Sequence, residues 1–132
     1  MSELGAQRRL ARERALELLY EATIKDRPVG DILAALPVAP NPYTVALLVS
    51  AETHRARAHE LMSQFSHEWS LERFALIDRL IMTLAIGELL QEEPPPTAVI
   101  LDEAVELAKT YSTEGSGSFV NGLLAACVTQ LP

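Results

Sequence analysis

Apolar residues recur every three to four positions along most of this chain, which is the spacing of one face of an α-helix. No stretch shows the strict alternation of apolar and polar residues that a half-buried β-strand requires. The predicted helices cover, approximately, residues 6–25, 31–36, 42–66, 71–74, 75–91 and 97–111 and the segment that follows an elbow over 112–118. The pattern therefore predicts an all-α fold of six to seven helices in one domain over residues 1–132, with residues 1–5 as a flexible end.

One helix is expected to lie at the centre of this fold. Between about Ala75 and Gln91 the chain is apolar on nearly every side, and such a helix is normally surrounded by others. The prolines at 94–96 end it, because proline cannot donate the backbone hydrogen bond that continues a helix. Asn41 before Pro42 predicts the start of another helix, since proline suits the first helical position.

The elbow over 112–118 is rich in serine and glycine. Ser116 or Ser118 is expected to cap the last helix, because a serine hydroxyl accepts a hydrogen bond from a free backbone N–H group at a helix start. Other free N–H groups at this corner are candidate donors to a ligand.

Composition narrows the class of protein. Hydrophobic residues make up 48% of the chain and charged residues 22%, as in globular proteins, and no run of about 18 apolar residues could span a membrane. The single cysteine, Cys127, lies on an apolar stripe, so we expect a buried thiol and no internal disulfide. These features favour a cytoplasmic protein without membrane contact.

The charge of the chain is unevenly spread. The formal net charge of −7 disfavours non-specific binding to nucleic acid, but residues 1–14 carry +2 and the remainder −9. At 100° per residue, Arg8, Arg9 and Arg12 lie together on one border of the first helix, and Tyr20 follows on the same flank. This edge is the only evident footprint for RNA, since arginine offers a planar fork of donors to phosphate and tyrosine can stack on an unpaired base. The alternatives are a solvated helix start for the arginines and a core-edge position for the tyrosine.

The sequence lacks the motifs of an enzyme or a metal site. Its three histidines, His54, His59 and His67, form no i,i+4 pair that would place two ring nitrogens on one helix face. No phosphate-binding glycine loop, nucleophile elbow or zinc-ligand spacing is present. The chain is therefore predicted to be non-enzymatic, with no cofactor and no metal.

Three segments carry the motifs of a known family. They are RRLARERAL over 8–16, DRLI over 78–81 with Glu88–Leu89 beyond it, and DEAVELAK over 102–109 with FVNGLL over 119–124. In this order they resemble the NusB family of bacterial transcription antitermination factors, and they cover most of the chain. The resemblance implies two small helical bundles packed as one domain.

The resemblance also implies a function and its residues. The chain would bind the single-stranded boxA element of ribosomal RNA leaders, with ribosomal protein NusE, other Nus factors and RNA polymerase as partners, and a homodimer is compatible with it. Carried over from the family, the RNA-binding residues are Arg8, Arg9, Arg12, Tyr20 and Ser116. Asp78 and Glu88 are carried over as partner-binding residues, although the apolar surroundings of Glu88 also allow a core partner or a solvent-facing end of the helix.

Several positions depart from the family pattern. Gly87 replaces a common aromatic residue, Ser118 a common lysine and Gly115 a common acidic residue. The altered elbow and the net charge of −9 beyond residue 14 favour an alternative, a NusB-like protein-interaction module without RNA binding. Such a module is similar to the N-terminal region of some ribosomal RNA cytosine methyltransferases. A small-ligand binder or enzyme is a further alternative and would require a deep pocket. The RNA hypothesis itself requires arginines that are free of carboxylate partners and close to the elbow.

Overall fold

The computed structural model describes residues 2–66 and 74–132, and every regular element within them is an α-helix. The helices are α1 (Glu3–Lys25), α2 (Val29–Ala34), α3 (Pro42–Thr53), α4 (Arg55–Ser66), α5 (Leu76–Leu89), α6 (Thr97–Tyr111) and α7 (Ser116–Val128). The all-α prediction is confirmed for this part of the chain. His67 and nearly all of the helix predicted over 71–74 lie outside the described residues.

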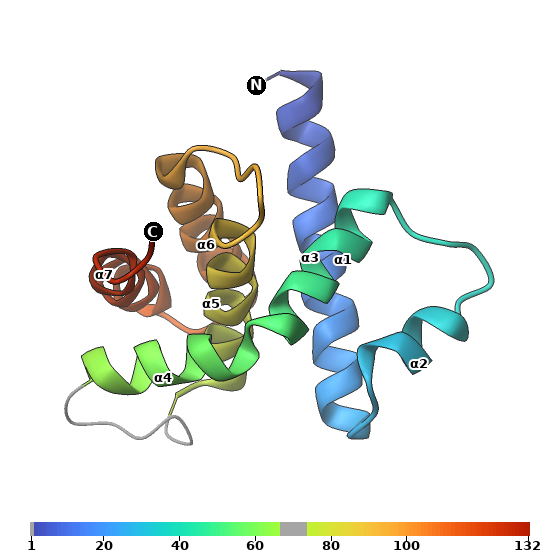
Figure 1. Ribbon diagram of the computed structural model, residues 1–132, viewed down its shortest axis with the longest axis horizontal. Coiled ribbons are helices and arrows are strands. Elements are labelled where there is room, and N and C mark those ends of the chain that lie inside the picture. Colours follow the sequence, from blue (N-terminus) through green and yellow to red (C-terminus); the bar gives the residue numbers. More distant parts are fainter. Residues whose placement is uncertain (1, 67–73) are drawn as a thin grey trace.

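Helix α5 runs through the middle of the molecule, as its apolar circumference predicts. Helices α1, α2 and α3 lie on one side of it and α4, α6 and α7 on the other (Figure 1). The side chains of Ile81, Met82 and Ile86 are at most 1% exposed, because neighbours cover α5 from both sides. The arrangement matches the expected pair of small helical bundles packed as one unit, with α5 shared between them.

A single apolar cluster joins the two groups of helices, since every helix contributes buried side chains to it. Six polar or charged side chains of the described residues are also buried, namely Arg12, Thr44, Asp78, Thr83, Glu88 and Ser116. Burying a polar group is unfavourable unless it is hydrogen-bonded, and in the described residues no buried side-chain nitrogen or oxygen lacks a partner. These six residues therefore mark the places where specific polar contacts fix the helices.

Helix α1 starts earlier than predicted. It begins at Glu3, so residues 3–5 are helical where a flexible end was expected. Ser2 caps the helix, because its hydroxyl oxygen accepts a hydrogen bond from the backbone N–H of Gly5 at 2.9 Å. Helix α2 is also displaced, starting two residues before the predicted position, directly after Pro28.

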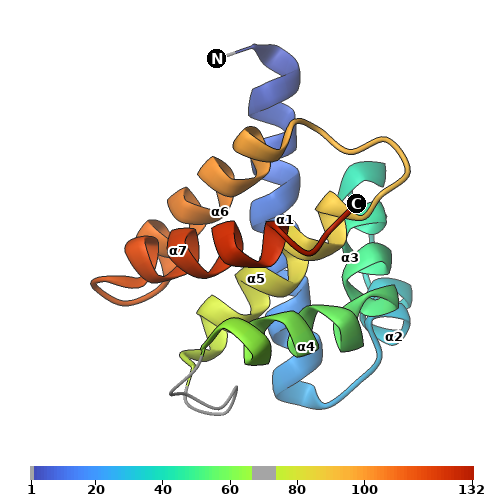
Figure 2. The same ribbon diagram turned by 60° about the vertical axis from the view of Figure 1, so that its left-hand side comes forward.

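The single helix predicted over 42–66 is two helices that point in different directions (Figure 2). They are separated by His54, whose φ of −106° and ψ of 12° lie outside the helical range. No glycine or proline marks the break; it follows from packing, since α3 packs on α1 and α5 whereas α4 packs on α5 and α7. The predicted start of α3 is confirmed, with the Asn41 side chain accepting from the backbone N–H of Tyr43 at 2.7 Å.

The elbow before α7 is shorter than the predicted 112–118. Helix α7 begins at Ser116, and neither serine proposed as its cap accepts a capping hydrogen bond. Gly115 precedes the helix with a φ of 87°, a left-handed conformation that glycine adopts without a steric penalty. The chain therefore turns between α6 and α7 over residues 112–115, and Ser116 lies inside the first helical turn.

Gly87 allows α3 and α5 to approach closely. A β-carbon at this buried position would lie 2.8 Å from the backbone nitrogen of Ala51 and 3.0 Å from its α-carbon. An aromatic side chain could not occupy this position without moving α3. The departure from the family pattern at Gly87 is therefore a feature of helix packing.

Gly87→Ala is expected to lower the free energy of unfolding by about 1–3 kcal/mol, because the added methyl group must separate two backbones. Gly122→Ala is the matched control, since Gly122 lies within α7 and a β-carbon there meets nothing within 4 Å. The control should be neutral or more stable by up to about 1 kcal/mol through helix propensity. Urea denaturation measures both variants, and equal effects would contradict the close approach of α3 and α5.

Candidate nucleic-acid interface

Arg8 is the arginine of the predicted edge that keeps its donors available. Its guanidinium carbon lies 4.8 Å from the centroid of the Tyr43 ring, a cation–π contact that orients the side chain. Among the described residues, no ion pair joins Arg8 to a carboxylate. Arg8 therefore fits the predicted role of a phosphate contact.

Arg12 lies inside the protein and is only 6% exposed. Its Nε and Nη2 atoms donate to the two carboxylate oxygens of Glu88 at 2.9 and 2.7 Å, and the Tyr43 hydroxyl donates to the same carboxylate. Burial opposes the charged form of Arg12, but its hydrogen bond and charge interaction with Glu88 outweigh burial and raise its pKa. Burial and the hydrogen bond to Glu88 likewise raise the pKa of Tyr43. This position differs from the exposed one that a direct RNA contact requires.

Glu88 has a core partner, which is one of the alternatives that its apolar surroundings left open. It is 2% exposed, and both of its carboxylate oxygens accept hydrogen bonds. A carboxylate at this depth is tolerated because a cation and further donors compensate its lost hydration. Glu88 therefore joins α5 to Arg12 of α1 and Tyr43 of α3, and it offers no atom to a partner on the surface.

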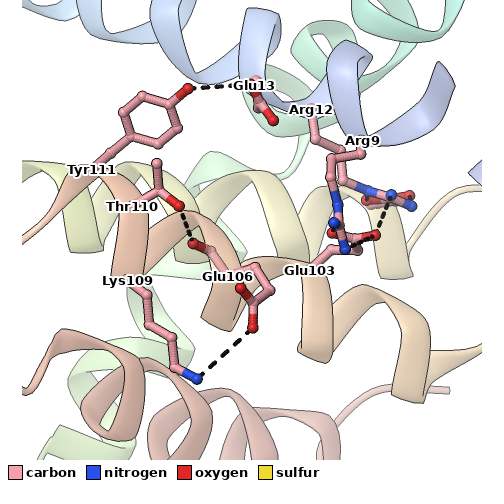
Figure 3. A network of polar contacts seen from close by, with 9 residues as sticks. Arg9, Arg12, Glu13, Glu103, Glu106, Lys109, Thr110 and Tyr111 are labelled. Carbon is pink, nitrogen blue, oxygen red and sulfur yellow. Dashed lines mark hydrogen bonds and ion pairs between the residues drawn. The ribbon is translucent and has the colours of Figure 1, made fainter. Parts of the chain in front are cut away.

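Arg9 forms a two-point ion pair with Glu103 of α6 (Figure 3). The Arg9 Nε and Nη2 atoms lie 2.9 and 3.2 Å from the two carboxylate oxygens, and this contact raises the pKa of the Arg9 guanidinium. The Arg9 side chain is 41% exposed. Because ion pairs in contact with water contribute little net free energy, an RNA phosphate can compete with Glu103 for this guanidinium.

The elbow between α6 and α7 is held by Asp78 of α5. The Asp78 carboxylate accepts hydrogen bonds from the hydroxyls of Ser112 at 2.6 Å and Ser116 at 3.0 Å. Asp78 is 5% exposed and Ser116 3% exposed. Their burial does not fit the predicted direct contacts of Ser116 with RNA and of Asp78 with a partner, because the two side chains face each other. The observed contacts instead fix the elbow against α5.

The end of α6 reaches the middle of α1 through a side-chain contact. Tyr111, the last residue of α6, donates a hydrogen bond to the Glu13 carboxylate of α1 at 3.2 Å (Figure 3). Tyr20 lies about two helical turns beyond Glu13 and is 42% exposed. Glu13 therefore interrupts the cationic edge where α1 meets the end of α6, while the elbow itself packs on α5 through Asp78. Among the described residues, no hydrogen bond or ion pair joins residues 112–116 to Arg8 or Arg9, so the closeness of the arginines to the elbow stays a prediction.

Sequence reasoning missed the partners that organise this edge. Glu103 and Tyr43 were not candidates, yet Glu103 pairs with Arg9, and Tyr43 contacts both Arg8 and the carboxylate of Glu88. A helical wheel of α1 carries no information about either partner, since both belong to other helices. The requirement for arginines free of carboxylates is met by Arg8 but not by Arg9, and Arg12 is likewise paired.

Across residues 2–66 and 74–132, no three or more His, Cys, Asp or Glu side chains are arranged to hold a metal ion. The Cys127 thiol is buried, as predicted, and burial raises its pKa to about 11. None of the described helices is both long and apolar enough to cross a membrane.

Comparison with known proteins agrees with this fold and these motifs. A model of the NusB family matches residues 9–129. The chain is 42% identical to the transcription antitermination protein NusB of Beutenbergia cavernae, over 96% of this chain and 92% of that protein. The structure of T. maritima NusB matches with a TM-score of 0.82 and 30% identity, over 93% of this chain and 91% of that one.

A structure of the antitermination factors NusB and NusE in complex with double-stranded RNA has the same fold. Its matching chain gives a TM-score of 0.78 at 22% identity, over 95% of this chain and 98% of that one. The family match spans nearly all of the sequence, from Arg9 in the arginine-rich start through the elbow and α7. The chain therefore belongs to the NusB family of transcription antitermination factors, which are not enzymes.

Proposed function

We propose that this protein binds a boxA-type single-stranded segment of a ribosomal RNA leader together with ribosomal protein NusE, and so helps RNA polymerase to resist termination in the cytoplasm. The observation that carries the proposal is the edge of α1 that holds Arg8, Arg9 and Tyr20, in a chain of the NusB family. The complex of a NusB protein with NusE and double-stranded RNA supports both partners, because that NusB shares this fold.

Three residues supply the direct contacts in this proposal. The guanidinium groups of Arg8 and Arg9 bind backbone phosphates, and each such contact releases counterions from the RNA. The half-exposed ring of Tyr20 stacks on an unpaired base. Single contacts of these kinds are each worth about 1–3 kcal/mol.

Four of the residues carried over from the family act indirectly in this proposal. Arg12 and Glu88 fix α1 against α5 and hold Tyr43 beneath Arg8. Asp78 and Ser116 hold the elbow against α5. They are positioning residues, and partner binding depends on them through the surface that they support.

The replacement of Arg8 and Arg9 by alanine tests the RNA edge. We expect the double variant to bind boxA RNA at least about tenfold more weakly in a gel-shift assay, with and without NusE, because two phosphate contacts are lost. Arg14→Ala with Arg57→Ala is the matched control, since it removes the same charge from exposed arginines that pair with Glu17 and Glu60. Unchanged binding in the first variant, or an equal loss in the control, would contradict the proposed edge.

The alternative is a NusB-like protein-interaction module that does not bind RNA. The pairing of Arg9 with Glu103 and the presence of Glu13 on the edge favour it, since both reduce the positive charge that RNA meets. In the same assay, NusE binding without any shift of boxA RNA would support this alternative. A homodimer is a separate prediction, which light scattering measures directly.

A further inference from the structure

A second cationic cluster lies at the far end of α1 from the arginine-rich start. Arg55 is the first residue of α4, His59 follows one turn later, and Arg79 lies near the start of α5. The three side chains line one hollow with a volume of about 80 Å³. The residues that line the hollow come from α1, α3, α4 and α5, which are labelled in Figure 2, and from Val29 at the start of α2.

The walls of this hollow are largely apolar. Leu19, Ala51 and Leu80 line it and are each less than 10% exposed. A wider hollow of about 370 Å³ adjoins it and shares Leu19, Glu52 and Arg55 with it. Charged groups at such a site are partly desolvated, and an ion of opposite charge is bound more strongly there than in open water.

The two guanidinium groups in this hollow lack ion-pair partners within the described part of the chain. Arg14, Arg27 and Arg57 each pair with a carboxylate three or four positions along the same helix or turn. No such pair is formed by Arg55 or Arg79 with a described carboxylate, although Glu52 lines the same hollow. Within residues 2–66 and 74–132, no carboxylate therefore occupies their guanidinium donors.

His59 adds a neutral donor to this cluster. Burial, followed by the charges of Arg79 and Arg55, lowers its pKa below the ordinary value of 6.5. The charged groups that face His59 are thus Arg55 on its own helix and Arg79 on α5, with Glu52 of α3 on the wall of the hollow. Two cations beside a half-buried ring repel each other, and a bound anion would relieve that repulsion.

We propose that the hollow binds a phosphate group, with Arg55 and Arg79 supplying guanidinium donors and His59 an imidazole N–H. Guanidinium forks match the oxygen spacing of phosphate and can bind two oxygens at once. A volume of about 80 Å³ is several times the roughly 10–15 Å³ that one water molecule needs, so the site has room for a small tetrahedral anion. The phosphate comes either from an RNA backbone or from a free phosphate. The proposal does not depend on the RNA edge at Arg8 and Arg9.

Titration with inorganic phosphate, followed through the His59 ring signals in NMR spectra, tests the site. We expect a saturable shift and a rise in the His59 pKa, because a bound anion favours the protonated ring. Arg55→Gln and Arg79→Gln should each weaken binding by about tenfold or more. Arg27→Gln is the matched control, since Arg27 lines the neighbouring hollow but pairs with Asp31.

Three results of this titration would show that the hollow does not bind phosphate. The proposal would be overturned if the His59 signals do not move with phosphate, or if they move equally with chloride at the same ionic strength. An equal movement in Arg55→Gln would also overturn it. Arg55 is exposed, so its variant keeps the test valid if Arg79→Gln does not fold. Displacement of phosphate by single-stranded RNA identifies the RNA backbone as the source, whereas bound phosphate that RNA leaves in place identifies a free phosphate.

Discussion

Replacing Glu88 with alanine is expected to lower the free energy of unfolding by about 3–5 kcal/mol, because the buried Arg12 guanidinium loses its two hydrogen-bonded carboxylate oxygens and keeps only Glu103 at 4.0 Å. Arg12 is 6% exposed, so solvent cannot compensate for the lost carboxylate unless α1 moves. The Tyr43 hydroxyl loses its acceptor in the same variant. Since domains of this size have total stabilities of about 5–15 kcal/mol, the loss should be evident in urea denaturation followed by circular dichroism.

Two further variants distinguish the stability effect of breaking the buried Arg12–Glu88 pair from the effect of removing any charge. Glu60→Ala removes an exposed ion pair with Arg57, and we expect a loss of less than about 1 kcal/mol. Arg12→Met combined with Glu88→Leu removes both buried charges and should recover most of the stability, since apolar pairs of similar size often replace buried ion pairs without loss. A loss below about 1 kcal/mol for Glu88→Ala would show that the pair does not fix α1 to α5.

Replacing Tyr20 with alanine is expected to weaken the binding of boxA RNA by about 1–3 kcal/mol, or about five- to 150-fold, through the loss of a stacking surface. The side chain is 42% exposed on α1, so its removal should leave the fold nearly unchanged. Fluorescence polarisation with a labelled single-stranded RNA measures the affinity, and urea denaturation checks the fold.

Conservative variants show whether the aromatic face of Tyr20 is responsible. Tyr20→Phe keeps the ring and should bind RNA nearly as well as the unaltered protein, whereas Tyr20→Leu keeps only apolar bulk and should resemble Tyr20→Ala. If Tyr20→Leu binds as tightly as the unaltered protein, stacking at this position is excluded.

The helices could be predicted from the sequence wherever local signals decide them. The apolar circumference of α5 and the Asn41 cap of α3 are local features, and both have the predicted structural role. The break at His54 has no local signal, because it arises from the different neighbours of α3 and α4. The predicted elbow over 112–118 ran too far, because α7 already starts at Ser116. The left-handed conformation of Gly115, which marks this start, is one of several that a glycine in the elbow could adopt.

The site could be predicted only in outline. Helical periodicity predicts the flank of α1 that carries Arg9 and Arg12. It does not predict whether each guanidinium is exposed or buried, or which carboxylate it pairs with. Their carboxylate partners, Glu103 and Glu88, lie 94 and 76 positions away in the sequence. Whether an arginine of α1 is available or buried therefore depends on the packing of α5 and α6 against it, which the pattern within α1 does not contain.

The most direct test of RNA binding by the Arg8–Arg9 edge is the salt dependence of affinity for boxA RNA. A plot of log affinity against log salt concentration should fall with a slope of about −0.7 for each phosphate contacted on a single strand. For Arg8→Ala with Arg9→Ala, two contacts are lost, so the slope should be shallower by about 1.4. An identical slope for the double variant and the unaltered protein would contradict phosphate binding at this edge.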